Sequence, residues 1–189
     1  MNATAILAAP IATARLDLEP LRLAHAETCY ASFADPSLYR FIDLPMPADA
    51  AELRERFAGW RRGSGRPDEA WLNWIAFERG TGRAAGWFQA TVRHADGEAD
   101  IAYLVFGTFQ RRGVASEVVR AMADRLFAAT DVLTLVAQTD ERNEASRRAA
   151  LAAGFAADPL PFASTLRGEP STDCVFRLRR PPGTVASPG

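Results

Sequence analysis

The order of apolar and polar positions predicts a strand, two helices and an antiparallel meander in the first half of the chain. Alternation over residues 15–19 predicts the strand. Apolar residues at helical spacing predict helices over 25–33 and from Asp49 to Arg62, where Asp49 and Glu52 form a capping-box pattern. Turn residues then separate three apolar runs that predict two consecutive hairpins, over 71–77, 85–92 and 99–106.

The pattern changes period in the second half. Helical spacing predicts helices over 113–127 and 143–153, the second ended by Gly154, with a short apolar strand over 132–136 between them. The order strand, helix, strand from 99 to 136 predicts a parallel pair with a right-handed crossover. Two last strands, over 155–160 and 174–178, are separated by what reads as a loop.

The length of 189 residues is that of one domain, which we place at 15–179. Residues 180–189, rich in proline and glycine, are expected to be a disordered tail. Residues 1–14 are expected to be a loose tail. The alternative, a signal peptide, lacks a positively charged start and is interrupted by Pro10.

Composition excludes several classes of function. The net charge is −1, which lacks the basic footprint of a nucleic-acid-binding protein. All 22 basic residues are arginine, so Schiff-base and P-loop lysine chemistry is excluded. The two cysteines lie far apart, which favours a reducing, cytoplasmic setting, and with two histidines they suggest no metal site. No apolar run reaches the roughly 18 residues of a membrane-spanning helix.

The segment over 100–116 carries the clearest chemistry, because a strand leads through Gln110-x-x-Gly113-x-Ala115 directly into a helix. The first N–H groups of a helix have no intrahelical partner, and the helix dipole is positive there. Gly113 and Ala115 allow close approach, and Arg111 and Arg112 add charge. This pattern predicts a seat for a pyrophosphate. The alternative is a tight turn with solvated arginines. The absence of Walker and dinucleotide fingerprints argues against a nucleotide-binding protein.

Five segments in this order resemble the GNAT acetyltransferase superfamily, in particular the branch of the ribosomal-protein N-terminal acetyltransferases. The resemblance covers roughly 15–179 and implies an α/β (α+β) fold. Its central mixed, mostly antiparallel twisted sheet would have about seven strands, with a parallel pair that splays apart, flanked by about four helices. The segments are Arg15-Leu-x-Leu-x-Pro-Leu21, Asp100-Ile-Ala-Tyr-Leu-Val105, Gln110-x-x-Gly113-x-Ala115, Asn143-x-x-Ser146 followed by Gly154-Phe155, and Asp173-x-x-x-x-Leu178.

The resemblance implies that acetyl-CoA is the acetyl donor. Its pantetheine arm would pair with the end of the central strand, Asn143 would contact that arm, and Ser146 would contact the sulfur; Asn143 can equally be a helix N-cap. The backbone N–H of Val105 would stabilise the oxyanion. The cofactor-binding residues implied are Leu104, Val105, Phe106, Gln110, Arg111, Arg112, Gly113, Val114, Ala115, Ser116, Asn143 and Ser146.

The reaction needs a neutral amine, and the resemblance implies that Asp100 accepts its proton through water. Glu98, two residues earlier on the same face, is the second candidate. Both could instead be solvated residues at a hairpin end. Many members of the superfamily place a tyrosine acid seven residues after the helix Asn, and that position is Ala150 here. The branch that the chain resembles instead has a serine at the third position after the Asn, which corresponds to Ser146, so the resemblance implies that Ser146 contacts the sulfur.

The acceptor side is less determined. The resemblance points to aromatic and polar residues in three segments, although Trp74 could equally belong to the core. These residues are Phe41, Asp43, Trp71, Asn73, Trp74, Gln89 and Tyr103.

The sequence therefore predicts an N-acetyltransferase that moves an acetyl group to a primary amine, on a protein N-terminus or a small molecule, by direct attack in a ternary complex. The alternative is a catalytically silent acyl-CoA-binding sensor or scaffold. We expect neither nucleic acid nor membrane as a partner. Homodimers are common in the branch, and nothing in the sequence demonstrates one.

Overall fold

The predicted strands join in one mixed sheet. The computed structural model describes residues 9–183 and orders the strands β1-β2-β3-β4-β5-β6-β9-β7, with β8 paired to β9. All pairs are antiparallel except β5 with β6, as the sequence predicted. The strands are β1 (Ile11–Ala12), β2 (Leu16–Pro20), β3 (Glu69–Glu78), β4 (Ala84–Arg93), β5 (Glu98–Val105), β6 (Thr134–Asp140), β7 (Ala156–Ala157), β8 (Phe162–Leu166) and β9 (Glu169–Arg179).

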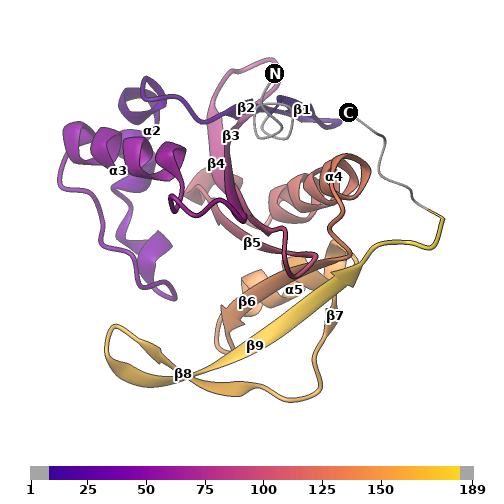
Figure 1. The fold of residues 1–189 in the computed structure, drawn as a ribbon. Helices are drawn as coiled ribbons and strands as arrows, with labels where there is room; N and C mark the ends of the chain where they lie inside the picture. Colours follow the sequence, from indigo (N-terminus) through magenta and orange to yellow (C-terminus); the bar gives the residue numbers. More distant parts are fainter. Residues whose placement is uncertain (1–8, 184–189) are drawn as a thin grey trace.

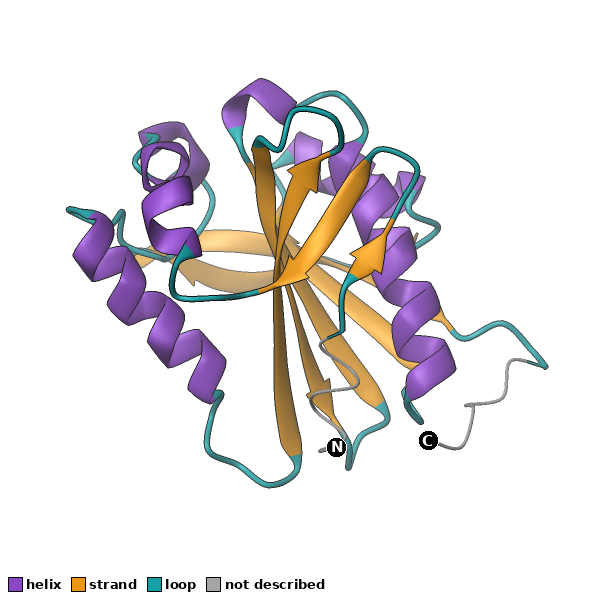
Figure 2. Cartoon of the chain, turned by 90° about the horizontal axis from the view of Figure 1, so that it is seen from above, coloured by secondary structure: helices purple, strands orange, loops and turns teal. Residues whose placement is uncertain are grey.

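Helices cover both faces of the sheet, as Figures 1 and 2 show. On one face, α2 and α3 pack over a core cluster that includes Phe33, Phe57 and Ile75. On the other face, α4 packs over a larger cluster that includes Trp74 and Met122. The helices are α2 (His25–Phe33), η1 (Pro36–Tyr39), α3 (Ala50–Arg62), η2 (Gly107–Phe109), α4 (Val114–Ala129) and α5 (Glu144–Ala152).

The one parallel pair separates soon after it forms. Strand β6 pairs with β5 only through residues Glu98, Ala99 and Asp100, and then continues along β9 over its whole length. Beyond Asp100, the edge of β5 that faces β6 therefore has no neighbouring strand. The other edge stays paired with β4 as far as Val105, whose partner is Gly86. A Cβ at Gly86 would lie 2.5 Å from the carbonyl oxygen of Leu104, so only glycine allows this close pairing.

The N-terminal region differs from the loose tail expected for 1–14. Residues 1–8 lie outside the described part, but Ile11 and Ala12 form β1 against β2. Ile11 is 6% exposed, and the carbonyl oxygen of Ala9 accepts a hydrogen bond from Trp74 Nε1 at 3.1 Å. The segment is ordered because its apolar side chain adds to the core and its backbone extends the sheet.

The expected late loop is a hairpin. Strands β8 and β9 pair from Phe162 with Asp173 to Leu166 with Glu169. The two residues between them, Arg167 and Gly168, have φ of 53° and 81°, the pattern of a type I′ turn. An arginine at its first position gave no turn signal, and the prolines nearby suggested a loop. The predicted strand over 155–160 shrinks to β7.

Just beyond β9, Arg180 is held beside the start of β6. The backbone N–H of Arg180 donates to the carbonyl oxygen of Leu133 at 2.9 Å. The rest of the expected tail, 184–189, lies outside the described residues. Within residues 9–183, no helix is both long enough and apolar enough to span a bilayer.

Candidate functional site

The loop between β5 and α4 presents unpaired backbone N–H groups. Arg111 and Gly113 have φ of 60° and 76°, and α4 begins at Val114. The N–H groups of residues 111–116 donate to no acceptor within residues 9–183. Left-handed residues next to a helix N-terminus aim such groups into one concave space, which is a binding site for an anion.

Neighbouring side chains hold this loop in place. Gln110 Nε2 donates to the carbonyl oxygen of Val105 at 3.0 Å, which ties the loop to the end of β5. Arg112 pairs with Glu78 at 2.9 Å, and its guanidinium lies 5.1 Å from the ring centre of Phe109. The loop geometry is therefore fixed by contacts on both sides, and part of the charge of Arg112 is already neutralised.

Glu117, in the first turn of α4, would oppose an anion at this helix end. Arg15 neutralises it: its Nε donates to Glu117 at 2.7 Å, and its Nη2 donates to the carbonyl oxygen of Arg112 at 3.0 Å. The hydroxyl of Thr13 donates to the same carboxylate at 2.6 Å. Burial alone would raise the pKa of Glu117, but these hydrogen bonds outweigh it and lower that pKa below its ordinary value.

A cavity of about 310 Å³ lies where β5 and β6 separate. The carbonyl of Ala85 accepts the N–H of Phe106 at 2.9 Å. Backbone groups alternate along an antiparallel strand, so the N–H of Val105 points to the opposite, unpaired edge of β5. The cavity is lined by Phe41, Ile42, Asp43, Ile101, Ala102, Tyr103, Ala137, Gln138, Thr139, Asp140, Asn143, Ser146, Thr165, Leu166 and Asp173.

Two predicted cofactor residues meet at the start of α5 in this cavity. The side-chain oxygen of Asn143 accepts the N–H of Ser146 at 3.2 Å, so Asn143 is the N-cap. The hydroxyl of Tyr103 lies 3.1 Å from Ser146 Oγ and crosses from β5 to α5. Burial raises the pKa of Tyr103, so its phenol stays protonated.

Three carboxylates line the cavity, from Asp43, Asp140 and Asp173. Asp140 pairs with Arg142 at 2.6 Å and accepts from Ser171 at 2.8 Å. Hydrogen bonds from Arg142 hold the pKa of Asp140 well below its ordinary value, so it is a poor proton acceptor at neutral pH. Asp173 accepts from Gln138 at 2.7 Å.

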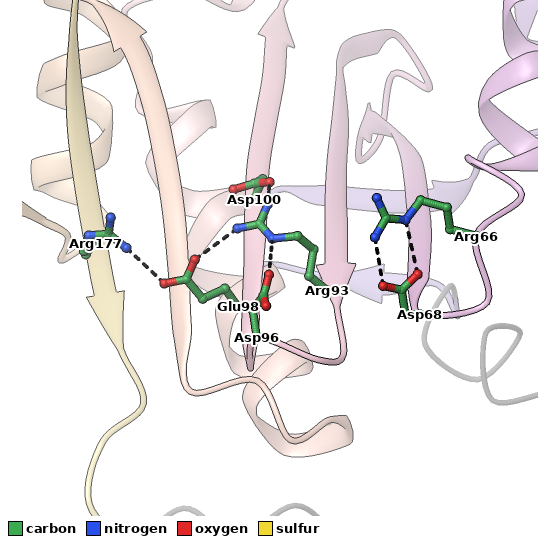
Figure 3. Close-up of polar contacts among 7 residues, drawn as sticks. All are labelled: Arg66, Asp68, Arg93, Asp96, Glu98, Asp100 and Arg177. Atoms are coloured by element: carbon green, nitrogen blue, oxygen red, sulfur yellow. Dashed lines mark hydrogen bonds and ion pairs between the residues drawn. The ribbon is translucent and has the colours of Figure 1, made fainter. Parts of the chain in front are cut away.

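Glu98 and Asp100 lie at the start of β5, outside the lining of this cavity. Figure 3 shows them around the guanidinium of Arg93, which pairs with both and with Asp96 at 3.2 Å. Arg177, from β9, pairs with Glu98 at 3.1 Å. The two predicted bases share one face, as expected, but both are occupied by arginine.

The predicted acceptor residues divide between the cavity and other places. Phe41, Asp43 and Tyr103 line it, whereas Trp71, Asn73, Trp74 and Gln89 do not. The expectation that Trp74 contacts the acceptor is wrong: its side chain is 0% exposed and belongs to the core on the α4 face. Successive side chains of a strand point to opposite faces of the sheet, so Trp74 and its neighbour Asn73 lie on different faces.

The other three residues have local partners instead. Asn73 accepts from Trp87 Nε1 at 3.1 Å, Trp71 Nε1 donates to Glu69 at 2.5 Å, and Gln89 donates to Thr91 at 2.5 Å.

Sequence reasoning missed several residues of the cavity. Thr165 and Leu166 reach it because β8 folds back over the cleft, and that hairpin had no clear turn signal. Asp140 and Gln138 belong to the part of β6 beyond the predicted strand end. Asp173 lies in a segment that the resemblance quoted, without a role in the site. Within residues 9–183, no group of three or more acidic, histidine or cysteine side chains is placed to hold a metal ion.

Comparison with known proteins defines the class. The family model described as "Acetyltransferase (GNAT) domain" matches residues 15–156. The chain therefore belongs to the GNAT acetyltransferase family and is an acyltransferase by class. No curated protein sequence matches this chain.

Solved structures share the fold at low identity. RimL, a ribosomal L7/L12 α-N-protein acetyltransferase in complex with coenzyme A, has a TM-score of 0.80 at 18% identity, covering 90% of this chain and 97% of that one. The microcin C7 self-immunity acetyltransferase MccE, in complex with acetyl-CoA and AMP, has 0.78 at 16%, covering 88% and 93%. A provisionally named ribosomal-protein-serine acetyltransferase from Vibrio cholerae has 0.75 at 23%, covering 90% and 97%.

Proposed function

We propose that this protein transfers the acetyl group of acetyl-CoA to a primary amine in a ternary complex. The observation that carries the proposal is the continuity of three features: the N–H cradle of the 111–116 loop, the unpaired edge of β5, and the cavity where β6 diverges. Together they offer a place for a pyrophosphate, an extended amide chain and a reactive group. Acetyl-CoA has these parts in this order, and when bound it supplies an acyl group activated as a thioester.

The chain's own residues supply the rest. The N–H groups from Arg111 to Ser116 bind the pyrophosphate. The edge of β5 at residues 104–106 pairs with the pantetheine arm, and the N–H of Val105 stabilises negative charge on the acyl oxygen. The hydroxyl of Ser146 donates to the leaving sulfur. RimL and MccE are described with CoA and acetyl-CoA bound, which agrees with this choice of ligand.

The cavity favours a cationic acceptor. Its lining residues include three carboxylates and no basic side chain. Arg142 neutralises Asp140, but Asp43 and Asp173 form no ion pair within the described residues, so an ammonium group gains from entering and a carboxylate does not. An α-amine has a pKa near ~8 and loses its proton more readily than an alkylamine near ~10. A protein N-terminus and a small-molecule amine both fit this chemistry.

Ligand-dependent thermal stability tests the cofactor site. A ligand at about 100 times its Kd adds about 2.7 kcal/mol of stability. We expect acetyl-CoA and CoA to raise the melting temperature, and ATP and NADH to leave it unchanged. Gly113→Glu places a carboxylate against the pyrophosphate and is expected to abolish the rise.

The matched control is Gly65→Glu, which strains another left-handed glycine, in an exposed loop remote from the cradle. It should keep the full ligand response. A Gly113→Glu protein that binds acetyl-CoA as the parent does would overturn the assignment of the loop.

Acceptor-dependent release of the CoA thiol separates the proposed enzyme from its alternative, a silent acyl-CoA-binding domain. The enzyme releases thiol faster when a panel of amines includes its acceptor. Binding of acetyl-CoA without release for any peptide N-terminus, amino acid or polyamine would favour the silent domain.

A further inference from the structure

Tyr103 lines the cavity, and its hydroxyl contacts a residue of α5, outside its own strand. Its ring stacks on Phe88, with centroids 6.0 Å apart and an angle of 26°. Its hydroxyl reaches across the gap between β5 and α5 to Ser146, 3.1 Å from Oγ and 3.3 Å from the backbone carbonyl oxygen. The contact joins residues 43 positions apart in sequence.

Ser146 has a single hydroxyl hydrogen, so its direction decides what the residue can do. The phenol of Tyr103 also has one hydrogen, and two acceptors lie within its reach, the Ser146 carbonyl oxygen at 3.3 Å and Ser146 Oγ at 3.1 Å. If the phenol donates to the carbonyl, its oxygen can accept the Ser146 hydrogen and turn it away from the cavity. If the phenol donates to Ser146 Oγ instead, that oxygen is already occupied as an acceptor. Its own hydrogen is then free to point into the cavity.

We propose that Tyr103 is a positioning residue that donates to Ser146 Oγ and thereby directs the Ser146 hydrogen at the sulfur of CoA. The proposal rests on the proposed function. In the transfer, a bond forms between the amine nitrogen and the acyl carbon while the bond between carbon and sulfur breaks. The electron pair goes to sulfur, and the proton that nitrogen loses balances the one that sulfur finally gains. Ser146 stabilises the thiolate by a hydrogen bond in between.

This arrangement places a phenol near the sulfur from a strand. The helix position at which many members of the superfamily have a tyrosine is Ala150 here, and Ala150 is buried. The raised pKa of Tyr103 keeps its phenol a donor over the pH range in which amines and thiols titrate.

The test is the affinity for CoA as a function of pH, measured by calorimetry from about pH 6 to about pH 9.5, a range that brackets the ordinary thiol pKa of ~8.5. A hydrogen bond donated to the thiolate lowers the thiol pKa in the complex, so the parent protein binds CoA more tightly as pH rises. Tyr103→Phe should lose about tenfold of that gain, the worth of one hydrogen bond to a charged group. Its affinity at low pH should not change.

Two controls and a double-variant comparison separate this role from a structural one. Tyr39→Phe removes another buried hydroxyl, which donates to the carbonyl of Phe33 at 2.7 Å away from the cavity lining, and should titrate as the parent does. Desulfo-CoA keeps the phosphates of CoA but has no thiol, so its affinity should vary with pH in the same way for the parent and every variant. Ser146→Ala should lose the same gain as Tyr103→Phe, and the double variant should lose no more.

The outcomes are distinguishable. A Tyr103→Phe protein that follows the parent at every pH overturns the inference, as does a parent that binds CoA without pH-dependent gain. A parent that binds no CoA at any pH overturns the proposed function, and the inference with it.

Discussion

Arg93 lies between the two carboxylates that the resemblance offers as bases. It pairs with Glu98 at 3.0 Å and also with Asp100, in the short stretch where β5 and β6 are paired. Because Asp100 is paired with Arg93 and lies outside the cavity lining, a proton from the acceptor would reach it through a chain of water molecules or after a change in this ion pair. Asp43 and Asp173 already line that cavity and need no such change.

Replacement of Asp100 by Asn tests its role as the base. We expect kcat to fall by roughly 100-fold or more, the usual worth of a general base, while the Kd of acetyl-CoA stays within a few-fold of the parent. Steady-state kinetics over a pH series, with an acceptor in hand, gives both quantities. The control is Asp96→Asn, which removes another, more exposed partner of Arg93. Equal kcat for Asp100→Asn and the parent at every pH would show that Asp100 is not the base, and Asp173 would be the next residue to test.

Asp140 ties the end of β6 to β9, and its contribution to stability should depend on pH. Its pKa is lowered in the folded protein by hydrogen bonds from Arg142 and Ser171. A group with a lowered folded pKa stabilises the protein above its unfolded pKa, near 3.9, and loses this contribution as pH falls below that value. Asp140→Asn should therefore be destabilised at pH 7.

Urea unfolding of parent and variant at several pH values checks this expectation. The difference in unfolding free energy should shrink as pH falls below about 4. Asp131→Asn is the control, because Asp131 is exposed and forms no ion pair within the described residues. A difference for Asp140→Asn that is constant over the whole pH range would show that packing, and not charge, holds this strand end.

At the scale of elements, the N-terminal strands and the cofactor helix form one unit. Arg15, between β1 and β2, contacts both the first turn of α4 and the loop before it. The anion cradle therefore depends on a residue about 100 positions earlier in the chain, a separation of 97 to Arg112. These contacts give a physical reason for an arginine at the position just before β2.

Arg15→Leu should weaken binding of acetyl-CoA by roughly tenfold, since an unneutralised Glu117 then faces the pyrophosphate and the carbonyl of Arg112 loses its donor. Calorimetric titration measures the Kd. Arg79→Leu is the matched control, because Arg79 is about as exposed as Arg15 and pairs at 2.7 Å with Asp17, on β2. If the two variants bind acetyl-CoA equally well, the contacts of Arg15 do not contribute to the anion cradle.

At the scale of the whole molecule, the two faces of the sheet form the core, and the gap between β5 and β6, called the split below, forms the candidate site. The helices α2 and α3 cover one face and α4 covers the other (Figure 2). An apolar cluster lies beneath the helices on each face. The hairpin of β8 and β9 projects beyond the rest of the sheet (Figure 1), and its residues Thr165 and Leu166 line the cavity. The split is where the sheet has unpaired backbone, and the cavity lies there.

Hydrogen–deuterium exchange with and without CoA tests this division. Binding should slow exchange at residues 111–116 and at the end of β5, because their N–H groups gain acceptors from the ligand. The turn at Gly80 and the loop at Gly65 should exchange at the same rate in both states. Protection concentrated at those turns, with none along 103–116, would place the ligand elsewhere.

The sequence by itself determined the features whose physics is local. The apolar periods predicted the helices and most strands, and a glycine between a strand and a helix predicted the N–H cradle, because dihedral preference and helix ends act within a few residues. The parallel pair followed from the order of elements, and the family from the order of its motifs.

Tertiary structure alone decided the features that depend on which distant residues meet. The neighbouring side chains of Asn73 and Trp74 point to opposite faces of the sheet, and the register of β3 against β4 decides which face each one takes. The approach of Tyr103 to Ser146 and the contribution of β8 to the cavity lining join segments whose local patterns carry no information about each other. The sequence therefore predicted which side chains have useful chemistry, but only the tertiary structure showed the neighbouring residues that change their orientation and pKa.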